Sequence, residues 1–345
     1  MSKTIEERDK IRKYLLKHIG NNDASMVAKA MDTFSVSKTT VYKYLRQLEE
    51  EGTIMKTSGN TCKYILQRRL TQFYYSPKDG LDEDVIFRRD ISPLLDGLPK
   101  NVLEIWRYAF TEMMNNAIEH SRSETIRCLV SRDYINTMIF IVDDGIGVFN
   151  NIRNFFKETY NQDLSIDDAI MQLTAGKLTT AKEGHSGEGI FFTSRALDKF
   201  HLFSDNKIFT HNNFTEASFD VEPGELDNEK GTMVYMELSN TSRRKLNEVF
   251  DRFSDQTVGF NRTQIPIAQV FPDDYPMSRS EARRLAASIA RFGEVELDFA
   301  NVDNLGQAFT HELFVVFAKA HPDIVLLPTN CSAAVNGMIN RVLVQ

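Results

Sequence analysis

A continuous apolar run, Met138–Val142, ends in the sequence Asp143-Asp-Gly-Ile-Gly147. Because this run has no polar alternation, it predicts a strand that is buried on both faces. A carboxylate at the end of such a strand is costly to bury without a partner. The amino group of an adenine ring is a suitable partner, and Gly145 and Gly147 would let the backbone pass close to the base.

A helical segment upstream, Phe110–His120, places a carboxylate beside an amide. Residues four apart share one face of a helix, so Glu112 and Asn116 are neighbours there. A carboxylate can activate water as a general base, and an amide oxygen is a hard ligand suited to Mg²⁺. The same spacing occurs on ordinary solvated helix faces, so the pair does not define a site by itself.

Further glycine motifs follow along the chain. The sequence Gly184-His-Ser-Gly-Glu-Gly-Ile190 precedes a predicted helix over Phe191–Phe200. Free backbone N–H groups and a helix N-terminus can hold phosphates at such a place. A final pair, Gly231-Thr232, opens the strand-like run Met233–Leu238.

These motifs, in this order, resemble those of the GHKL (Bergerat-fold) ATPases, which include gyrase B subunits, histidine kinases and anti-sigma serine kinases. The resemblance covers roughly residues 82–245 and implies a two-layer α/β sandwich that binds ATP and Mg²⁺. It implies that Glu112 is the water-activating base, Asn116 the Mg²⁺ ligand and Asp143 the residue that reads adenine. The remaining implied site residues shape the base pocket (Gly145, Gly147), hold phosphate under a mobile lid (Gly184, Gly187, Gly189) and support the adenine end (Thr232).

The segment 150–183 is predicted to be helical, most regularly over Asp163–Leu173, and its end is predicted to be the lid. Lys177 and Lys182 could reach phosphates from there, although lysines in solvated loops commonly bind nothing. His120 and His185 are not expected to accept phosphate, since no helical hairpin with a phosphoacceptor histidine precedes the motifs.

The first 70 residues, the head of the chain, are basic, whereas the remaining residues, its body, are acidic. They contain 14 lysines and arginines against 8 acidic residues, and the remainder of the chain contains 27 against 40. Helices are predicted over Ile5–Ile19, Asn22–Phe34 and Val36–Glu51, followed by strands over Thr53–Lys56 and Tyr64–Gln67. This pattern resembles a winged helix-turn-helix.

In the third predicted helix, Val41, Leu45 and Leu48 would pack inward, and the opposite face would be polar and basic. Such a face is suited to base edges and phosphates of double-stranded DNA. The predicted DNA-binding residues are Ser37, Lys38, Thr39, Tyr42, Lys43 and Arg46 from the helix, with Lys56, Asn60 and Lys63 from the wing. Alternatively, the module mediates protein contacts or caps the next domain.

A connector with proline and glycine breaks is predicted at residues 71–81, and the ATPase-like domain at 82–252. Within it, Asp82–Leu95 is expected to be one helix, and Pro99 is expected at the first position of the helix that carries Glu112.

Beyond residue 258, strands are predicted to alternate with helices, which calls for a mainly parallel sheet. The predicted strands are Ile265–Phe271, Val295–Phe299 and Ile324–Leu327, and the predicted helices are Ser280–Phe292, Gln307–Ala320 and Ala333–Val344. Ser278 and Glu281 fit a capping box. The stretch Leu297–Phe314 resembles the STAS-like domains of unknown function found behind such ATPases, which would place an α/β domain at 258–345.

The overall composition favours a cytoplasmic protein. No apolar run is long enough to span a membrane, and residues 1–8 have no signal-peptide core. Cys62, Cys128 and Cys331 are odd in number and far apart, which argues against disulfides and against a CxxC metal site.

The sequence therefore predicts a multidomain α/β regulator in which ATP controls a DNA-binding head and a STAS-like interaction domain, with a protein partner or a homodimer as further expectations. Two rivals remain. One is a serine/threonine kinase of the anti-sigma type that acts on a partner. The other is a transcription factor that senses the nucleotide without hydrolysing it.

Overall fold

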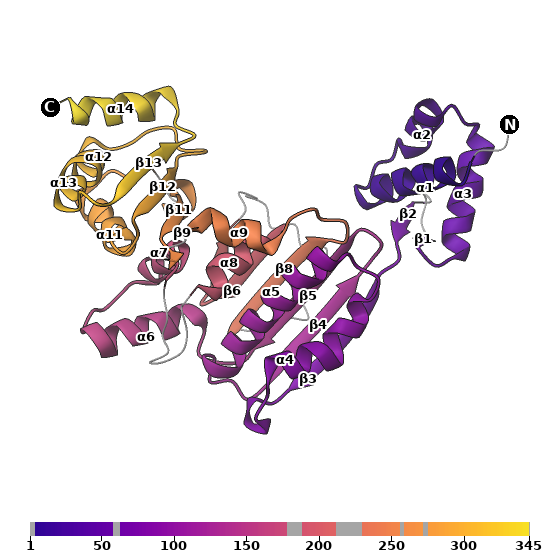
Figure 1. The fold of residues 1–345 in the computed structure, drawn as a ribbon, viewed down its shortest axis with the longest axis horizontal. Coiled ribbons are helices and arrows are strands. Elements are labelled where there is room, and N and C mark those ends of the chain that lie inside the picture. Colours follow the sequence, from indigo (N-terminus) through magenta and orange to yellow (C-terminus); the bar gives the residue numbers. More distant parts are fainter. Residues whose placement is uncertain are drawn as a thin grey trace.

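The computed structural model describes residues 4–57, 63–177, 188–211, 230–255, 259–271 and 275–344. The chain forms an N-terminal unit, a central unit built on a large sheet, and a C-terminal unit. Figure 1 shows the two terminal units on opposite sides of the central one. None of the helices in the described ranges has the length and apolar character needed to cross a membrane.

The N-terminal unit packs helices around one apolar core and ends in a short antiparallel hairpin. Its elements are α1 (Ile5–Gly20), α2 (Met26–Phe34), α3 (Lys38–Glu50), β1 (Ile54–Lys56) and β2 (Tyr64–Leu66). The helices and strands form where the sequence predicted them. The largest boundary difference is at α2, which begins only after a turn in which Asn22 has a left-handed φ of 52°.

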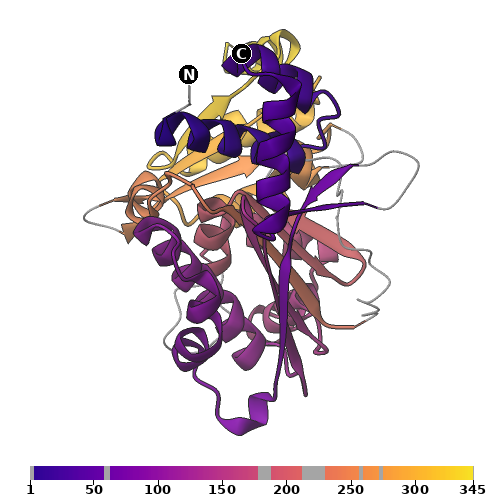
Figure 2. The ribbon, with the colours of Figure 1, turned by 90° about the vertical axis from the view of Figure 1, so that its right-hand side faces the viewer.

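The central unit is a 6-stranded antiparallel sheet in the order β3-β4-β5-β8-β6-β7. Its strands are β3 (Arg69–Tyr75), β4 (Ile126–Arg132), β5 (Asn136–Asp143), β6 (Lys199–Ser204), β7 (Lys207–Thr210) and β8 (Thr232–Ser239). Helices cover one face of the sheet, which Figure 2 shows nearly edge-on. They include α4 (Glu83–Ile86), α5 (Lys100–Glu119) and α8 (Gly189–Ala196).

Strand β5 is buried on both faces, as the sequence predicted. Ile139 and Ile141 pack in the core beneath the helices, and Met138 and Phe140 pack with Tyr235 in a separate cluster on the other face. The remaining helices of this unit are α6 (Val148–Tyr160), α7 (Ile166–Ala175) and α9 (Leu246–Phe253).

The predicted connector begins inside this sheet. Residues 71–75 belong to β3, which pairs with β4 along its whole length, and the 3-10 turn Pro77–Asp79 follows. Phe73 and Tyr75 alternate toward the core, so this segment has strand character ahead of the proline break.

Three other element predictions need correction. Pro99 is the N-cap of α5 and precedes its first helical residue. The segment Asp82–Leu95 is not one regular helix, because α4 is followed by a π turn and by a 3-10 turn that contains Pro93. The predicted helix Phe191–Phe200 ends at Ala196, since Leu197 is extended and Phe200 and Leu202 pack from β6.

The C-terminal unit has a 3-stranded parallel sheet, as its alternating pattern predicted, in the order β11-β12-β13. The strands are β11 (Arg262–Pro266), β12 (Glu294–Asp298) and β13 (Val325–Thr329), preceded by the ribbon of β9 (Ser254–Asp255) and β10 (Gly259–Phe260). The helices are α10 (Ile267–Val270), α11 (Arg279–Ile289), α12 (Gln307–His311), which continues through a π turn into α13 (Ala318–Ala320), and α14 (Ala333–Leu343).

Two details of this unit follow from its sequence. The strand predicted over Ile265–Phe271 ends at Pro266, which has no N–H to donate, and α10 follows it. The capping box of Ser278 and Glu281 at the start of α11 forms as predicted.

Candidate functional site

Asp143 lies at the end of β5 and is only 5% exposed. Its Oδ1 accepts hydrogen bonds from the backbone N–H groups of Gly145 (2.9 Å) and Thr232 (3.2 Å). Thr232 begins β8 and is the register partner of Asp143. The DxGxG and Gly-Thr motifs, which are far apart in the sequence, therefore meet at one buried carboxylate.

Two glycines are required around this carboxylate. A Cβ atom at Gly145 would collide with the carbonyl oxygen of Ser121, just after α5. A Cβ atom at Gly231 would collide with the carbonyl oxygen of Asp143, and Gly231 has a φ of +91°, which favours glycine. Larger residues at either position would displace the backbone that holds Asp143.

The ionisation state of Asp143 allows its side chain to accept hydrogen bonds. Burial raises the pKa of its carboxyl to about 6, while the hydrogen bonds from Gly145 and Thr232 oppose the rise. At neutral pH the group is still mostly ionised, so it can accept a hydrogen bond from a donor such as an exocyclic amino group. Because the Asp143 carboxylate is removed from water, a hydrogen bond donated to it is stronger than the same bond would be in water.

Gly147, which is predicted to shape the base pocket, also has a structural role at the start of α6. It is the N-cap of α6 with a φ of 82°, and a Cβ atom there would lie 2.6 Å from Ser204 Oγ. The N–H of Val148 donates to both Ser204 Oγ and Thr232 Oγ1, each at 3.1 Å. The glycine thus admits side chains from β6 and β8 that cap α6.

Ser204 and Asp205 were not predicted as part of this region. The Asp205 carboxylate accepts from the backbone N–H of Asn150 (3.3 Å) and from its side-chain amide. Asp205 and Asn206 both have left-handed φ angles in the β6–β7 turn. An Asp-Asn pair is a hairpin-turn signal in the sequence, but nothing local indicates that it caps a helix 55 residues upstream.

Glu112 lies on α5 where this helix meets α8. A Cβ atom at Gly189 would lie 2.1 Å from Glu112 Oε2, so the N-terminus of α8 lies directly against the Glu112 carboxylate. Tyr108 lies one turn before Glu112, and its pKa is raised by burial and then by the charges of Glu112 and Glu188. Asn116, one turn after Glu112, is half-buried.

Only some of the remaining predicted phosphate residues, and of the two histidines not expected to accept phosphate, lie within the described ranges. Gly184, Gly187, Lys182 and His185 lie outside the described residues. Lys177 precedes them, and its ammonium group donates to the carbonyl oxygen of Arg291 (3.3 Å) in the C-terminal unit. His120 is the C-cap residue of α5.

These residues fit an adenine nucleotide with Mg²⁺. Asp143 offers a desolvated acceptor, Glu112 offers carboxylate oxygens beside the N-terminus of α8, and Asn116 offers an amide oxygen one turn further along α5. Within the described ranges, no three His, Cys, Asp or Glu side chains gather into a metal-binding group. Mg²⁺ commonly keeps several waters and binds through one or two protein oxygens together with substrate phosphates.

In the N-terminal unit, the orientation predicted for α3 is confirmed. Val41, Leu45 and Leu48 are buried, and the predicted DNA-binding residues of the helix are exposed, with Tyr42 at 45%. Ser37 also caps α3 by accepting from the N–H of Thr40. On the hairpin, Lys63 is exposed, and Lys56 pairs with Glu49 at 3.4 Å. Asn60 lies outside the described residues.

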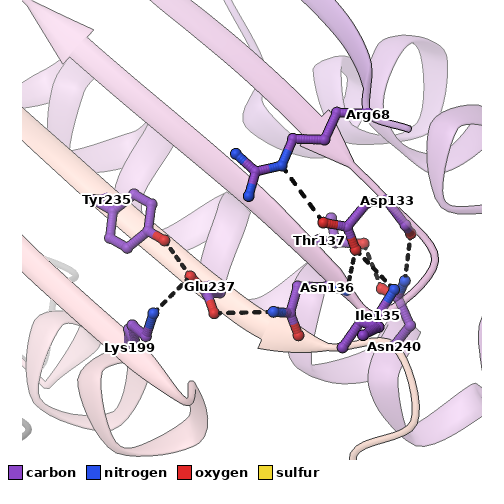
Figure 3. Close-up of polar contacts among 9 residues, drawn as sticks. All are labelled: Arg68, Asp133, Ile135, Asn136, Thr137, Lys199, Tyr235, Glu237 and Asn240. Atoms are coloured by element: carbon purple, nitrogen blue, oxygen red, sulfur yellow. Dashed lines mark hydrogen bonds and ion pairs between the residues drawn. The ribbon is translucent and has the colours of Figure 1, made fainter. Parts of the chain in front are cut away.

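A buried polar junction joins the N-terminal unit to the sheet, and Figure 3 shows it. Asp133, in the β4–β5 turn, accepts from the N–H groups of Ile135 (2.7 Å) and Asn136 (2.8 Å) and pairs with Arg68 (3.5 Å). The Asn136 side chain donates to Glu237, which also accepts from Tyr235 and Lys199. Hydrogen bonds and ion pairs thus hold the turn at the start of β5, at the end opposite Asp143.

In the C-terminal unit, Gly306 is the N-cap of α12, and no side-chain hydroxyl caps this helix. The nearest hydroxyl within α12, that of Thr310, belongs to a residue with 0% exposure and donates to the carbonyl oxygen of Gly306 (2.8 Å). The Thr310 hydroxyl is therefore buried inside the C-terminal unit.

Comparison with known proteins identifies one part of the chain. The family model of the STAS-like domain of unknown function (DUF4325) matches residues 281–336, from α11 into α14. The predicted STAS-like domain is therefore confirmed over this range. No curated protein sequence matches the chain.

Proposed function

We propose that this chain is an ATP-binding regulator in which a GHKL-type (Bergerat-fold) central unit controls a DNA-binding winged helix and a STAS-like interaction domain. ATP with Mg²⁺ would bind between the end of β5 and the N-terminus of α8. Glu112 would activate the attacking water, and Asn116 would bind the metal ion.

One observation carries the nucleotide proposal: the ionisable carboxylate of Asp143 is buried at a strand end among backbone N–H groups. Burial raises the pKa of this carboxyl, and the hydrogen bonds from the Gly145 and Thr232 N–H groups oppose the rise. Such a group is common at functional sites. An adenine amino group would donate a hydrogen bond to this carboxylate.

The DNA proposal rests on the exposed face of α3 and on the net charge of the head. The predicted residues of this helix face outward, and residues 1–70 carry a net charge of +6. The body of the chain is acidic and would repel phosphate, so duplex DNA would approach from the head. Dimerisation would allow two heads to read two half-sites.

The test is incubation of the purified chain with γ-labelled ATP and Mg²⁺, followed in parallel for free phosphate and for labelled protein. Free phosphate with no labelled protein supports an ATPase. Labelled protein, either of this chain or of an added partner, would support the kinase rival. Binding without either product would support a nucleotide sensor, and absence of binding would refute the proposal.

A further inference from the structure

Lys177, which lies between α7 and the predicted phosphate glycines, contacts the C-terminal unit. Lys177 follows α7, and its ammonium group lies 4.9 Å from the ring centre of Phe292 and 5.5 Å from that of Phe260. It also donates to the Arg291 carbonyl oxygen at 3.3 Å. Both Arg291 and Phe292 lie within the range matched by the STAS-like family.

Further contacts attach the end of α7 and the residues that follow it to the C-terminal unit. Thr263 of β11 donates to the carbonyl oxygen of Ala175, the last residue of α7, at 2.7 Å. Arg291 donates to the Gln172 side chain at 3.2 Å. Gly176 has a φ of 83°, and a Cβ atom there would lie within 3.0 Å of both Phe191 and Phe260. The backbone conformation at Gly176 and these contacts therefore direct the Lys177 side chain toward the C-terminal unit.

The phosphate side of the site is close to this lysine. Burial lowers the pKa of Lys177, and the charge of Glu188, which precedes α8, opposes that effect. Glu188 also acts on Tyr108 together with Glu112. The ammonium group is thus within electrostatic range of the residues at the N-terminus of α8, but its short contacts are to the C-terminal unit.

We propose that the C-terminal unit withholds the Lys177 ammonium group from the phosphates of the nucleotide, so that ATP must compete with Phe260, Phe292 and the Arg291 carbonyl for this cation. The inference rests on the proposed ATP site. A protein partner that moves Phe292 would then raise the affinity for ATP.

A double-mutant cycle on the full chain tests this inference. Leucine at position 292 keeps an apolar side chain but removes the ring. The Lys177 ammonium group then loses the nearer of its two aromatic rings. Phe292→Leu is expected to tighten ATP binding about five- to tenfold in calorimetric titration, and Phe260→Leu is expected to act in the same direction. Phe292→Leu combined with Lys177→Gln should bind ATP no more tightly than Lys177→Gln alone.

Two controls sharpen the result. AMP, which lacks the β- and γ-phosphates, should bind the wild type and Phe292→Leu equally. Phe271→Leu removes a ring that packs on Phe309, and it should not change ATP affinity. Melting curves identify any variant that fails to fold, and Phe260→Leu then replaces Phe292→Leu in the cycle.

An unchanged ATP affinity in folded Phe292→Leu or Phe260→Leu would overturn the inference. So would an equal gain when Lys177→Gln is already present, or an equal gain for AMP. If the wild type binds ATP and Asp143→Asn does not, while the cycle shows no coupling, only this inference fails. If the wild type binds no ATP, the proposed function fails as well.

Discussion

At the residue scale, Asp143 combines burial, backbone hydrogen bonds and a raised pKa. We predict that Asp143→Asn abolishes ATP binding, because an amide NH₂ facing the adenine amino group replaces an acceptor with a donor. The neighbouring Asp144, which is exposed and holds the N–H groups of Glu124 and Thr125, provides the matched control Asp144→Asn. Normal calorimetric affinity of Asp143→Asn for ATP would refute the assignment.

The same residue predicts a pH dependence of stability. The pKa of Asp143 is about 6 in the folded chain and about 3.9 in an unfolded one, so folding favours the protonated form. The resulting stabilisation is complete below the unfolded value and is lost as the pH rises through 6. Asp143→Asn should therefore gain roughly 2–3 kcal/mol relative to wild type between pH 4 and pH 7.5. Urea unfolding at both pH values measures this, and a constant difference would contradict it.

Glu112 has a different predicted role. Glu112→Ala should leave ATP affinity largely intact and slow phosphate release by about 10²–10⁴-fold, because a general base acts on the water and not on the bound nucleotide. Glu119→Ala, an exposed change near the end of the same helix, is the control for both measurements. Turnover at the wild-type rate in Glu112→Ala would exclude Glu112 as the base.

At the element scale, α6 depends on a cap that comes from another part of the chain. Asp205→Ala removes the carboxylate that accepts from Asn150, and it should cost about 1–2 kcal/mol of stability. Asp163→Ala, in the exposed segment that follows α6, should change stability by less than about 0.5 kcal/mol. Equal melting temperatures for the two variants would show that the cap is unimportant.

Helix α3 is the element predicted to meet DNA. Lys43→Ala and Arg46→Ala should weaken duplex binding and each reduce the log–log salt slope by about 0.9, the amount for one phosphate contact. Lys319→Ala, an exposed change in the C-terminal unit, should leave the slope unchanged. If the full chain and the 1–70 fragment both fail to bind any duplex at low salt, the head is a protein-contact module.

At the scale of the whole molecule, the head is joined to the sheet by more than its chain connection. Only Gln67 and Arg68 separate β2 from β3, Arg68 pairs with Asp133, and Gly20 lies against the Ile135 side chain. A side chain at Gly20 would push this contact apart, since its Cβ atom would lie 2.7 Å from Ile135 Cδ1. The head and the central sheet should therefore move as one body.

This attachment can be measured with spin labels on α2 and α4. Arg68→Ala should broaden the distance distribution between them, because Asp133 then lacks its cation. Lys78→Ala removes an exposed ion pair with Glu124 and should leave the distribution unchanged. A distribution that is already broad in the wild type would contradict the prediction of a rigid junction.

Local chemistry in the sequence was sufficient for much of the fold. The unbroken apolar run Met138–Val142 determined a strand buried on both faces, because residues on a strand alternate between them. The apolar spacing of Val41, Leu45 and Leu48 determined which face of α3 is exposed. Alternating strands and helices after residue 258 determined a parallel sheet, since parallel strands need crossover connections.

Only the tertiary structure decided what depends on contacts between distant segments. Gly147 gives Ser204 and Asp205 room to cap α6 from another hairpin, and nothing in the sequence around it indicates that contact. Residues 71–75 became a strand because β4 was available to pair with them. Lys177 turned toward Phe292 and Arg291, whose approach depends on how the C-terminal unit packs against α7. The periodicity of a sequence indicates which face of a helix or strand is buried. Which other segment covers that face is determined by the packing of the whole chain.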